Sequence, residues 1–163
     1  MTADGAGKAA KPGDRTLSSN RRATHEYFID ERLEAGIVLS GSEIKSLRAG
    51  QASLAESYVR IDERGEAWLV GAHIAGYEHA GYANHEPIRR RKLLLRRRQL
   101  DDLARKVKIK GVTLVPLRIY VARGWAKLEV GLARGKKQHD KRETIRGRDQ
   151  QRDMDRALAQ LRR

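Results

Sequence analysis

Apolar and polar residues alternate along two neighbouring stretches of the chain, which is the pattern of half-buried β-strands. In residues 112–122, the odd positions share one mostly apolar face. After a turn at Arg123 and Gly124, the even positions of residues 126–132 are all apolar. The pattern predicts a β-hairpin, with Pro116 at an edge or a bulge because proline cannot donate a hydrogen bond to the ladder.

A second hairpin is predicted earlier in the chain. Tyr58–Ile61 and Ala67–Val70 are short β-branched and aromatic runs, and the polar loop between them contains Gly65, which can adopt a positive φ. The apolar runs at residues 27–29 and 35–39 indicate either two further strands or one long bent strand.

Two short helices are predicted between the strands. Ser42 is a suitable N-cap for a helix over residues 43–48. Apolar residues at helical spacing between positions 100 and 107 predict the other helix. We expect Asp101 and Asp102 in its first turn, where carboxylates favour the helix dipole.

These elements predict a fold that is mainly β with short helices. Short antiparallel strands in one compact region favour a closed barrel, because an open sheet would leave edges to protect. An antiparallel β-barrel of the oligonucleotide/oligosaccharide-binding (OB) type over residues 20–134 fits best. Residues 1–19 are small and polar, with too little apolar mass to bury, and are expected to be disordered.

Residues 135–163 form a basic hinge and C-terminal tail. From Arg134 to Arg148 there are seven Lys/Arg residues against two acids, a net charge of +5. Asp140 and Glu143 have the spacing of a helix-capping pair, but the following residues carry few apolar side chains. We therefore expect the tail to be disordered when free and helical when phosphates neutralise its arginines.

Composition narrows the class of partner. The formal net charge is +14, which attracts polyanions. The sequence has no cysteine, no apolar run near the about 20 residues of a membrane span and no apolar signal-peptide core. These features favour a cytoplasmic protein that binds nucleic acid and no membrane.

The sequence offers little for catalysis, and no enzyme, cofactor or metal is predicted. Residues 131–137 imitate a phosphate-binding loop but are one residue short and lack the Ser/Thr that follows Gly-Lys. His79 and His85 lie near glutamates, yet loop histidines at a surface are the ordinary interpretation. The few aromatic residues, of which Tyr27 and Tyr58 are candidates for stacking, favour recognition of a folded RNA by its shape and backbone.

Six motifs in a fixed order resemble the SsrA-binding protein family, also called small protein B. They are Asn20–Arg22, His25–Ile29, Glu34–Ile37, Glu43–Gly50, Arg91–Leu95 and Gly135–Arg142. The resemblance runs from Asn20 to about Arg148. It implies an OB-type barrel that binds the tRNA-like domain of transfer-messenger RNA, and a tail that acts in the decoding centre and messenger channel of stalled bacterial ribosomes.

The resemblance also implies roles for individual residues. Asn20, Glu34 and Leu95 correspond to positions tied to RNA binding. The segment that acts at the decoding centre corresponds to Gly135, Lys136, Lys137, His139, Asp140, Lys141 and Arg142. Arg21 and Arg22, in the first motif with Asn20, are also RNA-binding candidates. Electrostatics adds Lys45, Arg48, Arg91 and Lys92 as candidates for phosphate contacts.

The leading hypothesis is therefore an RNA-binding adaptor that works as a monomer with transfer-messenger RNA and the ribosome. The alternative is a ribosomal or translation-factor-like OB-domain protein that binds ribosomal RNA through a similar basic tail. A nucleic-acid-processing enzyme would need a carboxylate cluster for a metal, which the sequence does not offer.

Overall fold

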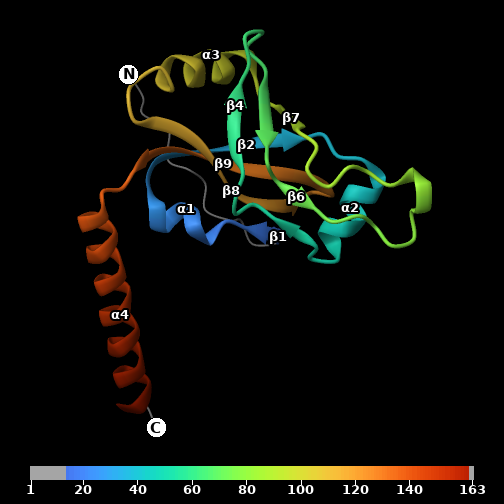
Figure 1. The fold of residues 1–163 in the computed structure, drawn as a ribbon. Coiled ribbons are helices and arrows are strands. Elements are labelled where there is room, and N and C mark those ends of the chain that lie inside the picture. The colour runs from blue at the N-terminus through green and yellow to red at the C-terminus, as the bar shows by residue number, and fades with distance from the viewer. Residues whose placement is uncertain (1–13, 162–163) are drawn as a thin grey trace.

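The computed structural model describes residues 14–161, apart from the side chains of residues 138 and 139. Its strands are β1 (Arg15–Ser19), β2 (Tyr27–Ile37), β3 (Ala52–Ser53), β4 (Tyr58–Ile61), β5 (Ala67–Val70), β6 (His73–Ile74), β7 (Arg91–Leu94), β8 (Val112–Ala122) and β9 (Trp125–Gly135). The helices are α1 (Arg21–Glu26), α2 (Gly41–Arg48), α3 (Arg97–Lys106) and α4 (Gln138–Leu161), with a 3₁₀ turn, η1, at Gly81–Ala83. Figure 1 shows α4 leaving the barrel as a separate arm.

The larger sheet closes into an antiparallel barrel, as the sequence predicts. Its strand order is β1-β8-β4-β5-β7-β2-β9, and β8 also pairs with β9, so that the strands from β8 to β9 form a ring. β3 and β6 form a separate two-stranded sheet. Both predicted hairpins are present as β4–β5 and β8–β9, and residues 27–37 form one long strand.

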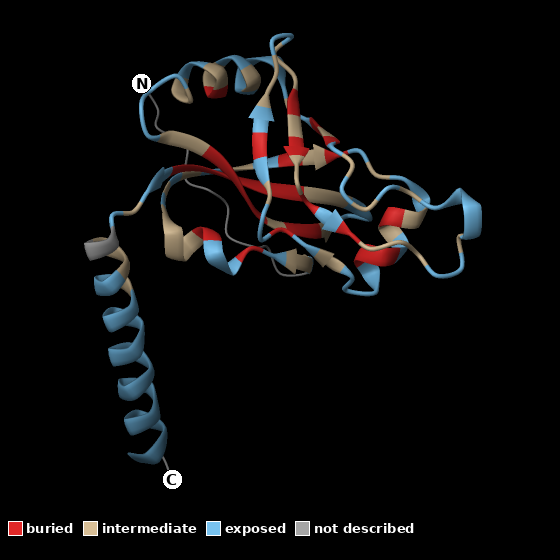
Figure 2. Ribbon diagram, in the orientation of Figure 1, coloured by how far each residue is buried: buried red, intermediate tan, exposed pale blue. Residues whose placement is uncertain are grey.

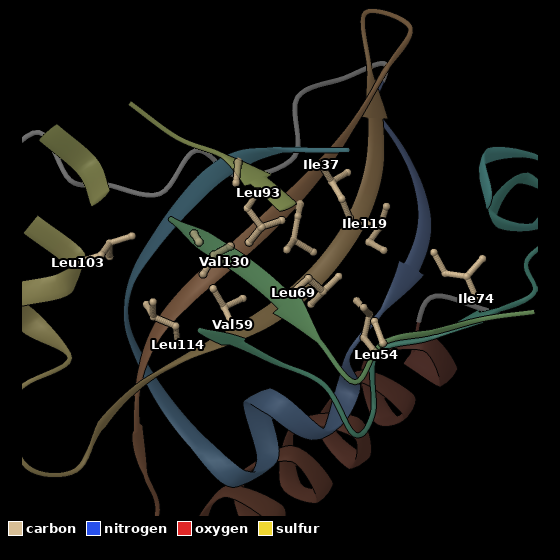
Figure 3. Packing of buried hydrophobic residues seen from close by; sticks show 14 of the residues in the cluster. Ile37, Leu54, Val59, Leu69, Ile74, Leu93, Leu103, Leu114, Ile119 and Val130 are labelled. Atoms are coloured by element: carbon tan, nitrogen blue, oxygen red, sulfur yellow. The ribbon is translucent and has the colours of Figure 1, made fainter. Parts of the chain in front are cut away.

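The barrel interior holds the main hydrophobic core (Figure 3). Leu69, Leu93, Ile119, Leu128 and Val130 are among its buried residues. Burial of this apolar surface is the main driving force for folding of the barrel. In Figure 2 the buried residues lie in the barrel and its covering helices, whereas α4 is exposed along most of its length.

A bulge in β8 changes which residues face the core. The register shifts between Pro116 and Arg118, so that Leu114 and Ile119 enter the main core while Val115 and Leu117 pack in a second cluster under α1. The bulge at proline is as expected. The expectation that all odd positions share one face is wrong, because an extra residue in one strand reverses the alternation.

The ordered region begins earlier than residue 20. Arg15–Ser19 form β1, which pairs with β8, so the expected disorder of residues 1–19 is wrong for this part. The remainder, residues 1–13, lies outside the described residues.

The starts of two helices also differ from expectation. The N-cap of α2 is Ser40 rather than Ser42, with Glu43 completing a capping box. Because α3 begins at Arg97, Asp101 and Asp102 lie beyond its first turn.

The tail forms the helix α4, which begins at Gln138. The Oδ2 of Asp140 accepts a hydrogen bond from the backbone N–H of Lys137 (3.3 Å), so Asp140 caps the start of the helix. Ile145, Met154, Leu158 and Leu161 are exposed, and no described residue of α4 joins either hydrophobic cluster. The barrel and the arm therefore share no core within residues 14–161.

Candidate nucleic-acid interface

The expected RNA-binding residues lie on several elements rather than in one cluster. Arg21 and Arg22 are on α1, Lys45 and Arg48 are on α2, and Lys92 is on β7. Figure 1 shows α1 and α2 on the same side of the barrel, and both helices contact neighbouring strands there. A binding surface on this side would be built from separate helices that the barrel holds in place.

Asn20 is structural as well as near the candidate surface. Its side-chain Oδ1 accepts from the backbone N–H of Ala23 (3.3 Å), and its Nδ2 donates to the carbonyl of Pro116 (3.0 Å). Asn20 is therefore the N-cap of α1 and ties this helix to the bulge of β8. A buried amide that is used in this way orients α1 and its two arginines.

Arg21 and Arg22 are exposed at the start of α1. A hollow of about 230 Å³ adjoins them, lined by residues 18–22 and 52–55. The guanidinium of Arg22 forms ion pairs with Glu56 (2.7 Å) and Glu26 (3.4 Å). Ion pairs at this exposure are worth little, so a phosphate could replace either carboxylate.

Lys45 and Arg48 are exposed on α2, as expected for phosphate contacts. The Nζ of Lys45 lies 5.3 Å from the ring centroid of Tyr77. Neither cation has a carboxylate partner among residues 14–161. Both charges are available to a polyanion.

Arg91 cannot be a phosphate contact in this structure, which corrects that expectation. Its side chain is fully buried, and its Nε donates to Oε1 of the equally buried Glu43 (2.8 Å). Its Nη1 and Nη2 donate to the carbonyls of Ala72 (2.8 Å) and Pro87 (3.1 Å). Burial is the main cause that lowers the pKa of Arg91, and the hydrogen bond to Glu43 opposes it.

Lys92, next to Arg91, is partly exposed and pairs with Glu66 (2.9 Å). Leu95 is half-buried and packs against the main core, so its side chain helps to shape the barrel.

Glu34 has protein partners on the neighbouring strands. The hydroxyl of Tyr120 donates to its Oε2, and the Nζ of Lys127 lies 3.3 Å from its Oε1. Burial and, secondarily, this hydrogen bond raise the pKa of Tyr120. The carboxylate of Glu34 is still half-exposed, so it fixes Tyr120 and Lys127 while keeping a face open to solvent.

The segment expected to act at the decoding centre joins the barrel to the arm. Gly135 ends β9, and Lys137, Asp140, Lys141 and Arg142 lie at the start of α4 or just before it. The side chain of His139 lies outside the described residues. Lys137 and Arg142 are exposed.

The ammonium group of Lys136 is bonded within the protein rather than free to contact RNA. Its Nζ donates to the carbonyl of Thr24 (2.9 Å) and to Oγ1 of Thr144 (3.1 Å), and lies 5.0 Å from the ring centroid of Phe28. Burial lowers its pKa. Lys136 thus links α1, β2 and α4 at the base of the arm.

Several aromatic side chains are more exposed than the sequence indicates. Tyr82 and Trp125 are highly exposed, and Phe28 and Tyr58 are partly so. Tyr82 lies in a segment without a helical or strand-like pattern of apolar residues. The one hint in the sequence that its ring is exposed is its place in a polar loop. Of the two tyrosines considered for stacking, Tyr58 is among these exposed side chains.

Within residues 14–161, no three His, Cys, Asp or Glu residues are grouped so that they could hold a metal. His85 is engaged by Ser42 and by the carbonyl of Ile74. No helix in this part of the chain is long and apolar enough to cross a membrane.

Comparison with known proteins assigns a family. Residues 17–160 match the family described as SmpB protein. An SsrA-binding protein of Roseiflexus castenholzii is 58% identical over 146 residues, which cover 89% of this chain and 92% of that protein. An SsrA-binding protein of Dehalococcoides mccartyi is 52% identical over 143 residues, covering 88% of this chain and 83% of the relative.

The fold agrees with a solved structure described as "tmRNA-SmpB: a journey to the center of the bacterial ribosome". That chain is 51% identical, has a TM-score of 0.63, and the match covers 78% of this chain and 93% of the other. Because the family match spans most of the chain and these relatives are more than half identical to it, the chain belongs to the SmpB family.

Proposed function

We propose that the protein binds the tRNA-like domain of transfer-messenger RNA and delivers it to stalled ribosomes for trans-translation, in which incomplete proteins are tagged. The observation that carries this proposal is the family match over residues 17–160, which includes both the barrel and the arm. The ribosomal or translation-factor-like alternative has no comparable support.

The barrel provides the RNA-binding part of this function. Arg21, Arg22, Lys45 and Arg48 are exposed cations on helices that Asn20 and the buried Glu43 hold in place. Charges on fixed supports suit a folded RNA, whose phosphates also have fixed positions. Glu34 orients Tyr120 and Lys127, and Leu95 packs against the core, so both help to shape the barrel that carries these helices.

The basic segment 135–163 provides the ribosomal part. Its arm carries exposed charges and shares no core with the barrel, so it can enter RNA-lined space without disturbing the fold. Lys137, His139, Asp140, Lys141 and Arg142 are the residues that we assign to the decoding centre, with Gly135 and Lys136 as the junction. The helix that the arm forms from Gln138 to Leu161 is stabilised when ribosomal phosphates neutralise its arginines.

This function requires no catalytic group, cofactor or metal of the protein, and it places the protein in the bacterial cytoplasm, where ribosomes are. RNA affinity should fall steeply with salt, because each neutralised phosphate releases counterions.

The direct test is to purify the protein from its native cell at moderate salt and to sequence the RNA that it retains. Transfer-messenger RNA should be the dominant species, and the protein should be substoichiometric on ribosomes in a sucrose gradient but enriched on stalled ones. Stoichiometric ribosomal association with ribosomal RNA as the only retained species would refute the proposal.

A further inference from the structure

The loop of residues 75–88, between β6 and β7, is held in one conformation by polar contacts. Asn84 bonds the backbone of Tyr77 twice: its Oδ1 accepts from the N–H and its Nδ2 donates to the carbonyl, both at 3.0 Å. His85 donates from Nε2 to the carbonyl of Ile74 (2.8 Å), and its Nδ1 lies 2.8 Å from Oγ of Ser42 on α2. The backbone N–H of Ala75 donates to the carbonyl of Gln51 (2.9 Å). The loop is thus fastened to the barrel and to α2.

Tyr82 lies at the outermost turn of this fastened loop, in η1, and its side chain is fully exposed. An aromatic ring that buries nothing contributes no hydrophobic stabilisation to the fold. Tyr77 and His79, on the same loop, pack edge to face with ring centroids 5.4 Å apart. The loop therefore presents one unused ring from a rigid base, which lowers the entropic cost of a contact there.

The surroundings indicate the chemistry of the partner. Lys45, whose Nζ lies over the Tyr77 ring, and Arg48 are exposed on α2, the helix to which the loop is fastened. The loop itself carries the exposed acids Glu78 and Glu86. Phosphate is therefore favoured beside α2 and disfavoured at the loop, where a neutral ring face is the better match.

We propose that Tyr82 stacks on an unpaired base of the bound RNA, while Lys45 and Arg48 contact phosphates beside it. This inference rests on the proposed function, and it names the kind of nucleotide that the β6–β7 loop reads. Every base has a π-face, and stacking on an exposed aromatic ring is the usual way in which proteins hold unpaired bases.

The test is to measure binding of the full chain to the tRNA-like domain of transfer-messenger RNA across a range of salt concentrations. Tyr82→Ala should weaken binding roughly 5- to 150-fold, the range typical of losing one stacked base, and Tyr82→Phe should retain most of the affinity. The slope of log affinity against log salt should stay unchanged in both variants, because no phosphate contact is lost. Lys45→Gln with Arg48→Gln should instead make that slope shallower.

Ile109→Ala, which removes an exposed apolar residue near α3, is the matched control and should change neither quantity. The thermal midpoint of Tyr82→Ala should equal that of the wild type, because its ring contacts no core. Nucleotide-resolved chemical probing should show one base that is protected by wild type and by Tyr82→Phe but not by Tyr82→Ala.

Unchanged affinity in Tyr82→Ala, with the wild type still bound, would overturn this inference while leaving the proposed function intact. An equal loss in Tyr82→Phe would also overturn it, since the hydroxyl rather than the ring would be responsible. A defect confined to ribosome association would reassign the loop to another partner. Failure of the wild type to bind this RNA at all would refute the proposed function instead.

Discussion

At the scale of single residues, a buried carboxylate organises the side of the barrel that carries α2. Glu43 accepts hydrogen bonds from Arg89 (2.8 and 2.6 Å), from Arg91 (2.8 Å) and from the backbone N–H of Ser40 (2.9 Å). Removing such charges from water is costly, and the cost is offset only when nearly every donor and acceptor is used. Through Arg91, which also donates to the carbonyls of Ala72 and Pro87, the cluster ties α2 to β7, to the residue before β6 and to the end of the β6–β7 loop.

Replacing Glu43 with Gln should destabilise the protein by roughly 3–5 kcal/mol, because the buried Arg91 loses its counter-charge. Urea unfolding followed by near-ultraviolet circular dichroism measures this free energy. Glu63→Gln, an exposed change on the β4–β5 loop, is the control and should fall within about 0.5 kcal/mol of wild type. A similar stability for both variants would show that the cluster contributes nothing.

The same cluster predicts a pH dependence. Burial raises the pKa of Glu43, but the hydrogen bonds from Arg89, Ser40 and Arg91 together outweigh it and leave the pKa below its ordinary value. A depressed carboxyl pKa stabilises the fold above the pKa of the unfolded state, about 4.3, and this stabilisation is lost as the pH falls through the folded pKa. The stability difference between wild type and Glu43→Gln should therefore stay constant from pH 7 to 5 and shrink below about pH 4.3. A difference that grows on acidification would contradict this assignment.

The roles of single residues were harder to predict from the sequence than the helices and strands. Arg91 was expected at a phosphate because it stands in a basic run, yet it shares a strand face with the buried Leu93. Residues two apart in a strand share a face, so the alternation of β7 alone could have predicted that Arg91 faces the barrel interior with Leu93. Its partner Glu43 lies 48 positions earlier in the sequence, and no local pattern links the two.

At the scale of elements, local patterns predicted the hairpins and the two middle helices well. They failed where tertiary contacts decide the outcome. β1 is short and polar and exists because β8 offers it an unpaired edge, and the bulge at Pro116 reverses the apolar alternation of β8. The polar residues of β1 give no local sign of this pairing. Pro116 does indicate an edge or a bulge, but not which residues of β8 the shifted register turns toward the core.

The junction at Lys136 gives a prediction for α4. Lys136→Met keeps the apolar stem and removes the donor to Thr24 and Thr144, so amide exchange in the first two turns of α4 should speed up about three- to tenfold. Hydrogen exchange read by mass spectrometry measures this. Lys137→Met, which changes the exposed neighbouring residue, is the control and should leave amide exchange unchanged. Equal effects from the two variants would show that Lys136 does not stabilise the start of α4.

A second prediction concerns the arm itself. A peptide of residues 134–163 should show only weak helicity by circular dichroism in buffer, because its apolar residues pack on nothing and Gly147 costs about 1 kcal/mol relative to alanine. Addition of RNA should raise the helicity, since phosphates neutralise the arginines. A strongly helical peptide without RNA would contradict the expected disorder of the free tail.

At the scale of the whole molecule, a closed barrel supports the cationic helices on one side, and a charged arm, α4, extends away from the barrel after the end of β9 (Figure 1). The barrel class could be predicted from the number and spacing of short strands. The order of strands could not, because β7 pairs between β5 and β2 through long-range contacts that carry no local signature. The weakening of the apolar pattern after the basic hinge also predicts that barrel and arm are separate parts, and this stays a prediction.

Deletion of residues 138–163 is the decisive test of this separation between an RNA-binding barrel and a ribosomal arm. The affinity of the shortened chain for the tRNA-like domain is measured beside an assay of tagging on stalled ribosomes. We predict RNA affinity within about threefold of the full chain, because at most one or two exposed charge contacts are lost, together with complete loss of tagging. Loss of RNA binding on this deletion, or tagging that persists without the arm, would show that the two parts do not divide the function in this way.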